Sequence, residues 1–286
     1  MIQIFIAGVL WGIIGIFVNE LNALGAGASL TGFMRMFFAF LIMTAAALLK
    51  NGRKIIIRDS KTIFLCALLG IICNGLFNVF YTNSIRLNGM GIACVLMYTA
   101  PVFTSIASRI IFHEKFSRIK IFALIMNIIG CILTVTGINI FSNDNISFMG
   151  IFSGIGSGFC YGMAAIIGRS AGEKTDSLNM SAYSFFFASL FLIIFARPDV
   201  MPALNDSRIM GVGFLYALIP TSIAYLVYYN GLNKIHDSSK VPVIASIEPV
   251  TAVIVGMLLY NEHIGAANFT GVAVVLVSIM IMMKAK

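Results

Sequence analysis

The sequence has few charged residues and only short connections between its apolar segments. Only 10% of its 286 residues are charged and 59% are hydrophobic, whereas soluble proteins carry about a quarter charged residues. The connections between apolar runs are about a dozen residues at most, which leaves no room for a separate soluble domain. Composition therefore predicts an all-α integral membrane protein.

The residue patterns of catalysis and metal binding are also missing. The three histidines lie at the ends of apolar runs, and the five cysteines lie within such runs without a Cys-x-x-Cys pair. There is no phosphate-binding loop and no set of nucleophile and base. The formal charge of +8 lies in short loops, not in a basic stripe with interleaved aromatic residues. We therefore expect no enzyme activity, cofactor, metal site or nucleic-acid partner.

Ten apolar segments are long enough to cross a hydrocarbon core of about 30 Å as helices. The seventh has the least clearly marked ends. The predicted transmembrane helices are Ile2–Val18, Leu30–Leu49, Ile63–Ile85, Gly91–Phe112, Ile121–Phe141, Met149–Gly168, Met180–Ala196, Arg208–Leu232, Val241–Tyr260 and Gly265–Met283.

Positive charge is concentrated in alternate connections and at the carboxyl end. Cytoplasmic loops of membrane proteins carry the excess of Lys and Arg, so both termini are predicted to lie in the cytoplasm. The residues on this side are 14 of the 19 Lys and Arg, namely Lys50, Arg53, Lys54, Arg58, Lys61, Lys115, Arg118, Lys120, Arg169, Lys174, Lys234, Lys240, Lys284 and Lys286.

Three sets of residues recur at a nearly constant spacing along the chain. The chain is therefore predicted to consist of two five-helix repeats, residues 1–141 and 149–286. Because five is odd, the repeats would have opposite orientations in the membrane, and such inverted repeats place a substrate site near the midplane. The matched residues are Tyr81 and Asn83 with Tyr228 and Asn230, Pro101 and Glu114 with Pro249 and Glu262, and Gly8, Trp11 and Gly12 with Gly158, Tyr161 and Gly162.

Glu248 and Pro249 lie about a third of the way into the ninth segment. A carboxylate at such a depth costs roughly 2.5–3.5 kcal/mol, so it is retained for a function by default. Proline removes a backbone donor and opens or kinks the helix. The equivalent Pro101 follows Ala100, so both repeats have a hinge proline but only one has the charge.

Arg35 lies about six residues into the second segment and admits two interpretations. Its long stem allows the guanidinium to reach the outer interface. Alternatively, its planar fork is suited to holding a carboxylate or phosphate.

Polar and aromatic side chains follow one face of several segments. They would either line a cavity or form hydrogen bonds between helices, worth about 0.6 kcal/mol a pair. The third segment carries Asn74, Asn78 and Tyr81 at helical spacing, their counterparts in the eighth are Thr221, Tyr225 and Tyr228, and Trp11, Tyr98 and Tyr161 would add aromatic walls or ordinary packing.

Two further features have structural interpretations. Glycines recur every fourth residue at Gly150, Gly154, Gly158 and Gly162, a spacing that favours close helix packing over substrate contact. Glu114 and Glu262 each precede the next helix, whose dipole would favour a capping carboxylate.

The two five-helix halves share a glycine-x-x-aromatic-glycine first helix, a proline in the fourth helix and a glutamate after it. In this arrangement the chain resembles the drug/metabolite transporter superfamily, and within it the ten-helix metabolite exporters, which include amino-acid exporters. The resemblance covers essentially the whole chain. It implies a basket-shaped bundle in the bacterial inner membrane, with a central cavity lined by helices one, three, four, six, eight and nine, and transport by alternating access.

These features predict a secondary transporter, an exporter of amino acids or related zwitterions or amines. Glu248 would hold an ammonium group or accept a coupling proton, and Arg35 would hold a carboxylate about 10 Å away along the membrane normal. The alternatives are a cation- or drug-selective transporter that uses Glu248 alone, and a passive channel. The predicted substrate-binding residues are Glu248, Arg35, Trp11, Asn74, Asn78, Tyr81, Tyr98, Tyr161, Tyr225 and Tyr228, with Pro101 and Pro249 as hinges.

Overall fold

The computed structural model describes residues 1–88, 90–114, 117–136, 147–235, 237–260 and 265–284, and the regular structure in these ranges is helical throughout. In the first half the helices are α1 (Ile2–Gly12), α2 (Ile14–Ala23), α3 (Ala28–Asn51), η1 (Gly52–Ile55), α4 (Ser60–Leu68), η2 (Leu69–Leu76), α5 (Phe77–Asn88), α6 (Met90–Met97), α7 (Ala100–Ile111) and α8 (Arg118–Thr136). In the second half they are α9 (Phe148–Gly172), α10 (Ser177–Leu204), α11 (Ser207–Ala217), η3 (Leu218–Ile223), α12 (Ala224–Leu232), α13 (Lys240–Ala245), α14 (Ile247–Tyr260) and α15 (Ala266–Lys284).

Ten helical stretches of 18 to 29 residues are long and apolar enough to cross a membrane. The predicted class, an all-α membrane protein with ten transmembrane helices, is confirmed. The seventh predicted span ends at Ala196, as does the apolar stretch Ser177–Ala196 of the structure, although the helix α10 continues to Leu204. The prediction began three residues too late, because Asp176 Oδ1 accepts a hydrogen bond from the Asn179 backbone N–H at 2.9 Å and so caps the helix near Ser177. The end of the fifth prediction at Phe141 lies outside the described residues.

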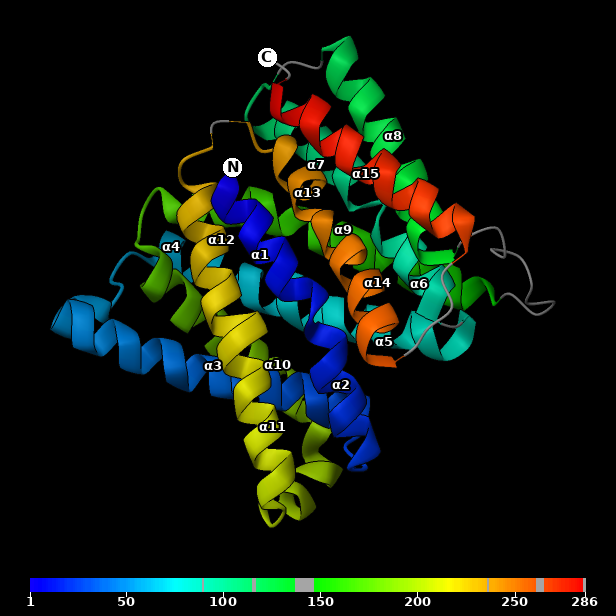
Figure 1. The fold of residues 1–286 in the computed structure, drawn as a ribbon. Coiled ribbons are helices and arrows are strands. Elements are labelled where there is room, and N and C mark those ends of the chain that lie inside the picture. The colour runs from blue at the N-terminus through cyan, green and yellow to red at the C-terminus, as the bar shows by residue number, and fades with distance from the viewer. Residues whose placement is uncertain (89, 115–116, 137–146, 236, 261–264, 285–286) are drawn as a thin grey trace.

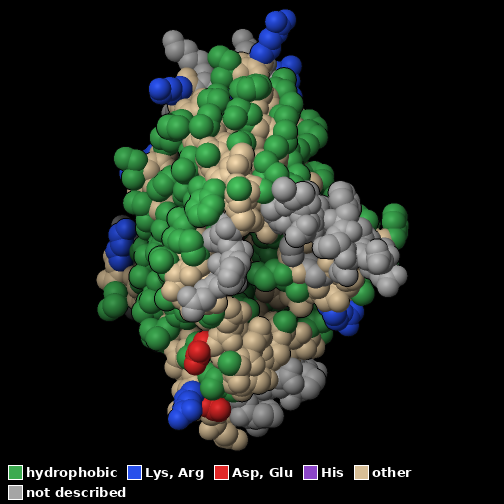
Figure 2. All heavy atoms as spheres, turned by 45° about the vertical axis from the view of Figure 1, so that its right-hand side comes forward, with side chains coloured by type: hydrophobic (Ala, Val, Ile, Leu, Met, Phe, Trp, Pro, Cys, Tyr) green, Lys and Arg blue, Asp and Glu red, His purple; other side chains and the backbone are tan. Residues whose placement is uncertain are grey.

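The outer surface of the bundle is apolar over much of its area. Figure 2 shows hydrophobic side chains over much of the visible face, above all its upper part, with Lys and Arg mainly at its edges. Leu49, Phe148 and Leu258 are 89%, 83% and 68% exposed, respectively. Such exposure is costly in water but suits helices whose backbone groups are satisfied internally and whose side chains face lipid.

The helices pack in pairs that are distant in sequence (Figure 1). α3 lies against α10, and α8 lies against α15. α1 packs against α12, α13 and α14, while α9 packs against α5, α6 and α7. The first helix of each half thus contacts the broken helix of the other half.

Glycines allow this close approach at the two breaks. A Cβ atom on Gly12 of α1 would lie 2.7 Å from the Glu248 carbonyl oxygen, and one on Gly158 of α9 would lie 2.9 Å from the Leu96 carbonyl oxygen. Both distances are too short for a side chain, so the packing interpretation of Gly158 is confirmed.

Two aspartates start the helices that carry the polar stripes. Asp59 accepts hydrogen bonds from the backbone N–H groups of Lys61 and Thr62 at the start of α4. Asp206 does the same for Arg208 and Ile209 at the start of α11. A side-chain cap of this kind contributes about 1 kcal/mol. The two aspartates are 147 residues apart, which matches the predicted repeat spacing.

Candidate functional site

The helix that carries Glu248 is broken just before it. α13 ends at Ala245 and α14 begins at Ile247, so Glu248 lies in the first turn of α14 and Pro249 follows it there. Proline is tolerated in a first turn, where the missing N–H would have had no partner. The positive end of the helix dipole favours a carboxylate at this position. The predicted opening of the helix is therefore present, at Ser246, three residues before the proline.

The other predicted hinge has the same form. α6 ends at Met97 and α7 begins at Ala100, with Pro101 in its first turn. A buried amide stabilises the break in α13 and α14, because the Asn127 side-chain N–H₂ of α8 donates to the hydroxyls of Ser246 and of Ser278. Asn127 was not identified from sequence, since a single polar residue in an apolar segment gives no indication of its partner.

Glu248 is partly buried and has one hydrogen-bond donor in the described part of the chain. The Tyr161 hydroxyl of α9 donates to Glu248 Oε2 at 3.1 Å. An ionised carboxylate can accept about four hydrogen bonds. Glu248 therefore retains acceptor capacity for an ammonium group or a proton, and Tyr161 is one of the predicted site residues that lies directly against it.

Aromatic rings from four helices pack around Tyr161 and Trp11, next to this carboxylate. The Trp11 ring of α1 lies 6.1 Å from Tyr161, 5.2 Å from Tyr225 and 5.1 Å from Tyr228 between centroids. Phe77 of α5 lies 5.8 Å from Tyr161. The Trp11 indole N–H is buried and without a partner in the described residues. Aromatic faces next to a carboxylate form an environment that attracts organic cations.

The two polar stripes begin at π-helical segments. In η2 the Asn74 side chain donates to the Leu69 carbonyl at 3.1 Å, and in η3 the Thr221 hydroxyl donates to the Tyr216 carbonyl at 3.0 Å. Each residue thus bonds to the carbonyl five positions earlier. Such segments occur frequently at functional sites. The Tyr225 hydroxyl donates to Asn74 Oδ1 at 2.9 Å and connects the two stripes.

Arg35 points into the bundle and is only 8% exposed. Its Nε donates to the Thr221 hydroxyl at 2.9 Å, and its guanidinium carbon lies 5.2 Å from the centre of the Tyr216 ring. These contacts place the charge among helices and not on the surface of the bundle. Among the described residues, no ion pair joins Arg35 to Glu248, although each is near enough to feel the other's charge.

The remaining predicted residues lie around this centre. Tyr81 stacks on Phe77 at 5.6 Å, and Tyr98 is 3% exposed in a core cluster with Ile247. Asn78 lies against Gly32 and lines a pocket of about 260 Å³ that neither Glu248 nor Arg35 lines. The structure therefore brings Glu248, Tyr161, Trp11, Tyr225 and Tyr228 into one cluster and leaves Asn78 at its edge.

A second carboxylate has the opposite surroundings. Glu114 Oε1 accepts from Arg169 Nη1 at 2.6 Å and from the Ser238 backbone N–H at 2.8 Å, and Oε2 accepts from the Ser239 N–H at 3.3 Å. Glu114 was predicted to cap the helix that follows it, α8. It instead binds backbone N–H groups just before α13, more than 120 residues away, where Arg169 at the end of α9 pairs with it and also donates to the Ser238 hydroxyl. Its counterpart Glu262 lies outside the described residues.

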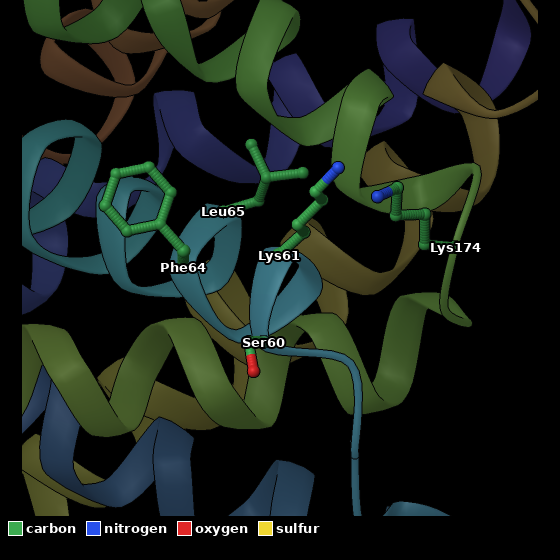
Figure 3. Close-up of a pocket in the computed structure, with 5 residues that line it drawn as sticks. All are labelled: Ser60, Lys61, Phe64, Leu65 and Lys174. Carbon is green, nitrogen blue, oxygen red and sulfur yellow. The ribbon is translucent and has the colours of Figure 1, made fainter.

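Another pocket, of about 400 Å³, lies between the start of α4 and the connection from α9 to α10. Figure 3 shows its five lining residues, which are Ser60, Lys61, Phe64, Leu65 and Lys174. It belongs to neither of the two carboxylate sites.

Comparisons with known proteins agree with this architecture. A family model described as the EamA-like transporter family matches residues 1–136 and 148–284. An uncharacterized transporter of Archaeoglobus fulgidus is 26% identical, over 97% of this chain and 94% of its own length. The uncharacterized inner membrane transporter YicL of Salmonella typhimurium is 22% identical, over 98% and 94%. A solved crystal structure that is 12% identical has a TM-score of 0.80 and covers 99% of this chain and 97% of its own.

Proposed function

Because this chain belongs to the EamA-like transporter family, within the drug/metabolite transporter superfamily, we propose that it exports small metabolites that carry an ammonium group, such as amino acids or related zwitterions and amines. Membrane transport follows from the family. The substrate class rests on the surroundings of Glu248, whose carboxylate has one donor, Tyr161, and faces a cluster of aromatic rings. An ammonium group fits both the charge and the rings.

The two opposite charges of Arg35 and Glu248, which are not paired with one another in the described part of the chain, favour a zwitterion. A carboxylate on the substrate would reach the Arg35 guanidinium while its ammonium group reaches Glu248. A coupling proton on Glu248 is a second proposed role, because a carboxylate exposed alternately to two sides is able to carry one.

A cation- or drug-selective transporter is the alternative that a specific observation favours. Arg35 already has a hydrogen bond to Thr221 and lies near the Tyr216 ring, so it is able to act as a structural residue. In that case Glu248 and the rings bind an organic amine alone. Substrates with and without a carboxylate distinguish the two proposals.

Alternating access would use the two predicted inverted repeats, residues 1–141 and 149–286, around a central cavity. Two observations support this. The capping aspartates Asp59 and Asp206 and the π-helix residues Asn74 and Thr221 are each 147 residues apart. The glycine-lined contacts α1–α14 and α9–α7 join each half to the hinge of the other. We propose that both termini lie in the cytoplasm and that the bacterial inner membrane is the location, as it is in the name of the relative YicL.

Counterflow in proteoliposomes tests the proposal. Vesicles that contain the purified protein are loaded with one unlabelled amino acid or amine at a time and diluted into its labelled form. A carrier gives a transient, saturable accumulation of label, whereas a channel gives none. Accumulation with zwitterions supports the first proposal, accumulation only with amines supports the alternative, and its absence across amino acids and amines contradicts both.

A further inference from the structure

The pocket at the start of α4 brings together two lysines from distant parts of the chain. Lys61 lies in the first turn of α4, and Lys174 follows the end of α9 at Gly172. In Figure 3 the ends of the two lysine side chains approach one another, with Leu65 and, further away, Phe64 on the opposite side of Lys61 from Lys174. Like charges repel at such a site unless an anion lies between them.

The protein itself balances only part of this charge. The Asp59 carboxylate lies 3.6 Å from Lys174 Nζ, and both side chains are solvent-accessible, at 53% and 40%. The same carboxylate also accepts hydrogen bonds from Thr62 and from the Lys61 backbone N–H. Lys61 has no ion pair among the described residues, so the pocket keeps a net positive charge.

The apolar side of the pocket faces the region where lipid would lie. Ser60 is the first residue of a stretch that is long enough to span a membrane, and Phe64 is one turn further in and 62% exposed. A ring with that exposure next to two ammonium groups presents an apolar surface and a positive charge at one helix end. Basic pockets of this kind between transmembrane helices suit anionic headgroups.

We propose that this pocket binds one anionic phospholipid of the surrounding bilayer. The phosphate lies between the ammonium groups of Lys61 and Lys174, and an acyl chain follows Phe64 along α4. A soluble phosphate would use the lysines but leave the apolar wall unused. Because Lys174 belongs to the second half of the chain and Ser60–Leu65 to the first, the bound lipid holds the two halves together at this end.

The test uses the full chain, purified in detergent and titrated with phosphatidylglycerol, phosphatidylcholine or inorganic phosphate. Native mass spectrometry counts the bound lipid and thermal unfolding measures its stabilising effect. The double variant Lys61→Gln/Lys174→Gln should bind phosphatidylglycerol about thirtyfold more weakly, because each lysine near an anionic headgroup strengthens binding severalfold. The matched control Lys50→Gln/Lys234→Gln removes the same charge outside the pocket and should bind as the wild type does.

Phe64→Ser separates the acyl contact from the charge. It should weaken phosphatidylglycerol binding while leaving the lysines in place. Equal loss in the two lysine double variants would show general surface attraction and overturn the proposal. The proposal is also overturned if inorganic phosphate stabilises the protein as well as the lipid does, or if Lys61→Gln/Lys174→Gln keeps wild-type lipid binding. Gel filtration of every variant establishes that it is folded.

Discussion

Glu114 and Glu248 lie at opposite ends of α13, Glu114 bound to the backbone just before it and Glu248 just after the break that ends it, and their surroundings differ in kind. Glu114 directly pairs with Arg169 and accepts two backbone N–H groups, so its acceptor sites are largely used. Glu248 has the Tyr161 hydroxyl, and the nearby cation Arg35 is held by Thr221. A carboxylate that is already satisfied holds helices together, whereas one with free acceptor sites is available to a ligand. This difference supports the proposal that Glu248 is the binding residue.

The largest effect is expected for Glu248→Gln, which should abolish counterflow or uncouple it from pH. Glutamine nearly preserves the shape and still accepts the Tyr161 hydrogen bond, but it has no charge for an ammonium group or a proton. Counterflow at pH 6 and pH 8 measures the loss. The unfolding temperature without substrate should remain near that of the wild type. Wild-type transport with unchanged pH dependence would show that Glu248 has no such role.

Glu114→Gln should have the opposite effect: it should leave counterflow largely intact and reduce the stability of the protein. Removing one partner of a buried ion pair costs roughly 3–5 kcal/mol, and we expect about 2 kcal/mol here because Arg169 keeps its hydrogen bond to Ser238 and its contact with the Phe112 ring. Thermal unfolding in detergent measures the change. The control Glu20→Gln removes an exposed carboxylate, and an equal loss there would contradict the importance of the Glu114 network. Substrate-dependent stabilisation should persist in both variants.

Hydropathy and proline placement were sufficient to predict the ten spans and the two helix breaks, because these are local properties of the chain. The sequence analysis placed Tyr161 and Glu248 in the same candidate site, but it did not predict the hydrogen bond between them. The partners of Glu114 and Arg35 were not predicted, because Ser238 follows no periodic pattern and Thr221 was placed only in a polar stripe. Each partner lies more than 120 residues away from the side chain that it binds. The π-helical turns were also missed. Pro220 could have indicated the irregular turn at η3, because proline interrupts a regular helix. No proline marks η2, where the Asn74 side chain donates to the Leu69 carbonyl.

Arg35→Gln distinguishes the zwitterion from the amine as substrate. If Arg35 holds a carboxylate, the substrate concentration for half-maximal counterflow should rise about 10- to 100-fold for zwitterions, because a hydrogen bond to a charged group contributes roughly 1.5–3 kcal/mol. Amines that lack a carboxylate should be unaffected. The control Arg109→Gln removes an exposed arginine that bonds only to the Glu114 carbonyl among the described residues. Equal changes for both substrate types would assign Arg35 a structural role.

The smallest effect concerns Asp237, which extends the paired region around Glu114. Burial acts to raise the pKa of Asp237, but the hydrogen bonds and charge of Lys120 and the Ser239 hydroxyl outweigh it and hold the pKa below its usual value. A lowered pKa in the folded state stabilises the protein above the unfolded value of about 3.9, and this stability is lost as the pH falls through the folded value.

Asp237→Asn should therefore lower the free energy of unfolding at pH 7 by less than about 1 kcal/mol, which lowers the unfolding temperature slightly. The difference from the wild type should vanish as the pH falls below about 4. Unfolding temperatures measured from pH 7 to pH 3 test this. Glu173→Gln, which removes an exposed carboxylate, is the control. A difference that persists at low pH would mean that the Asn substitution disturbs packing, and that the charge of Asp237 does not contribute to the paired region as the contrast with Glu248 requires.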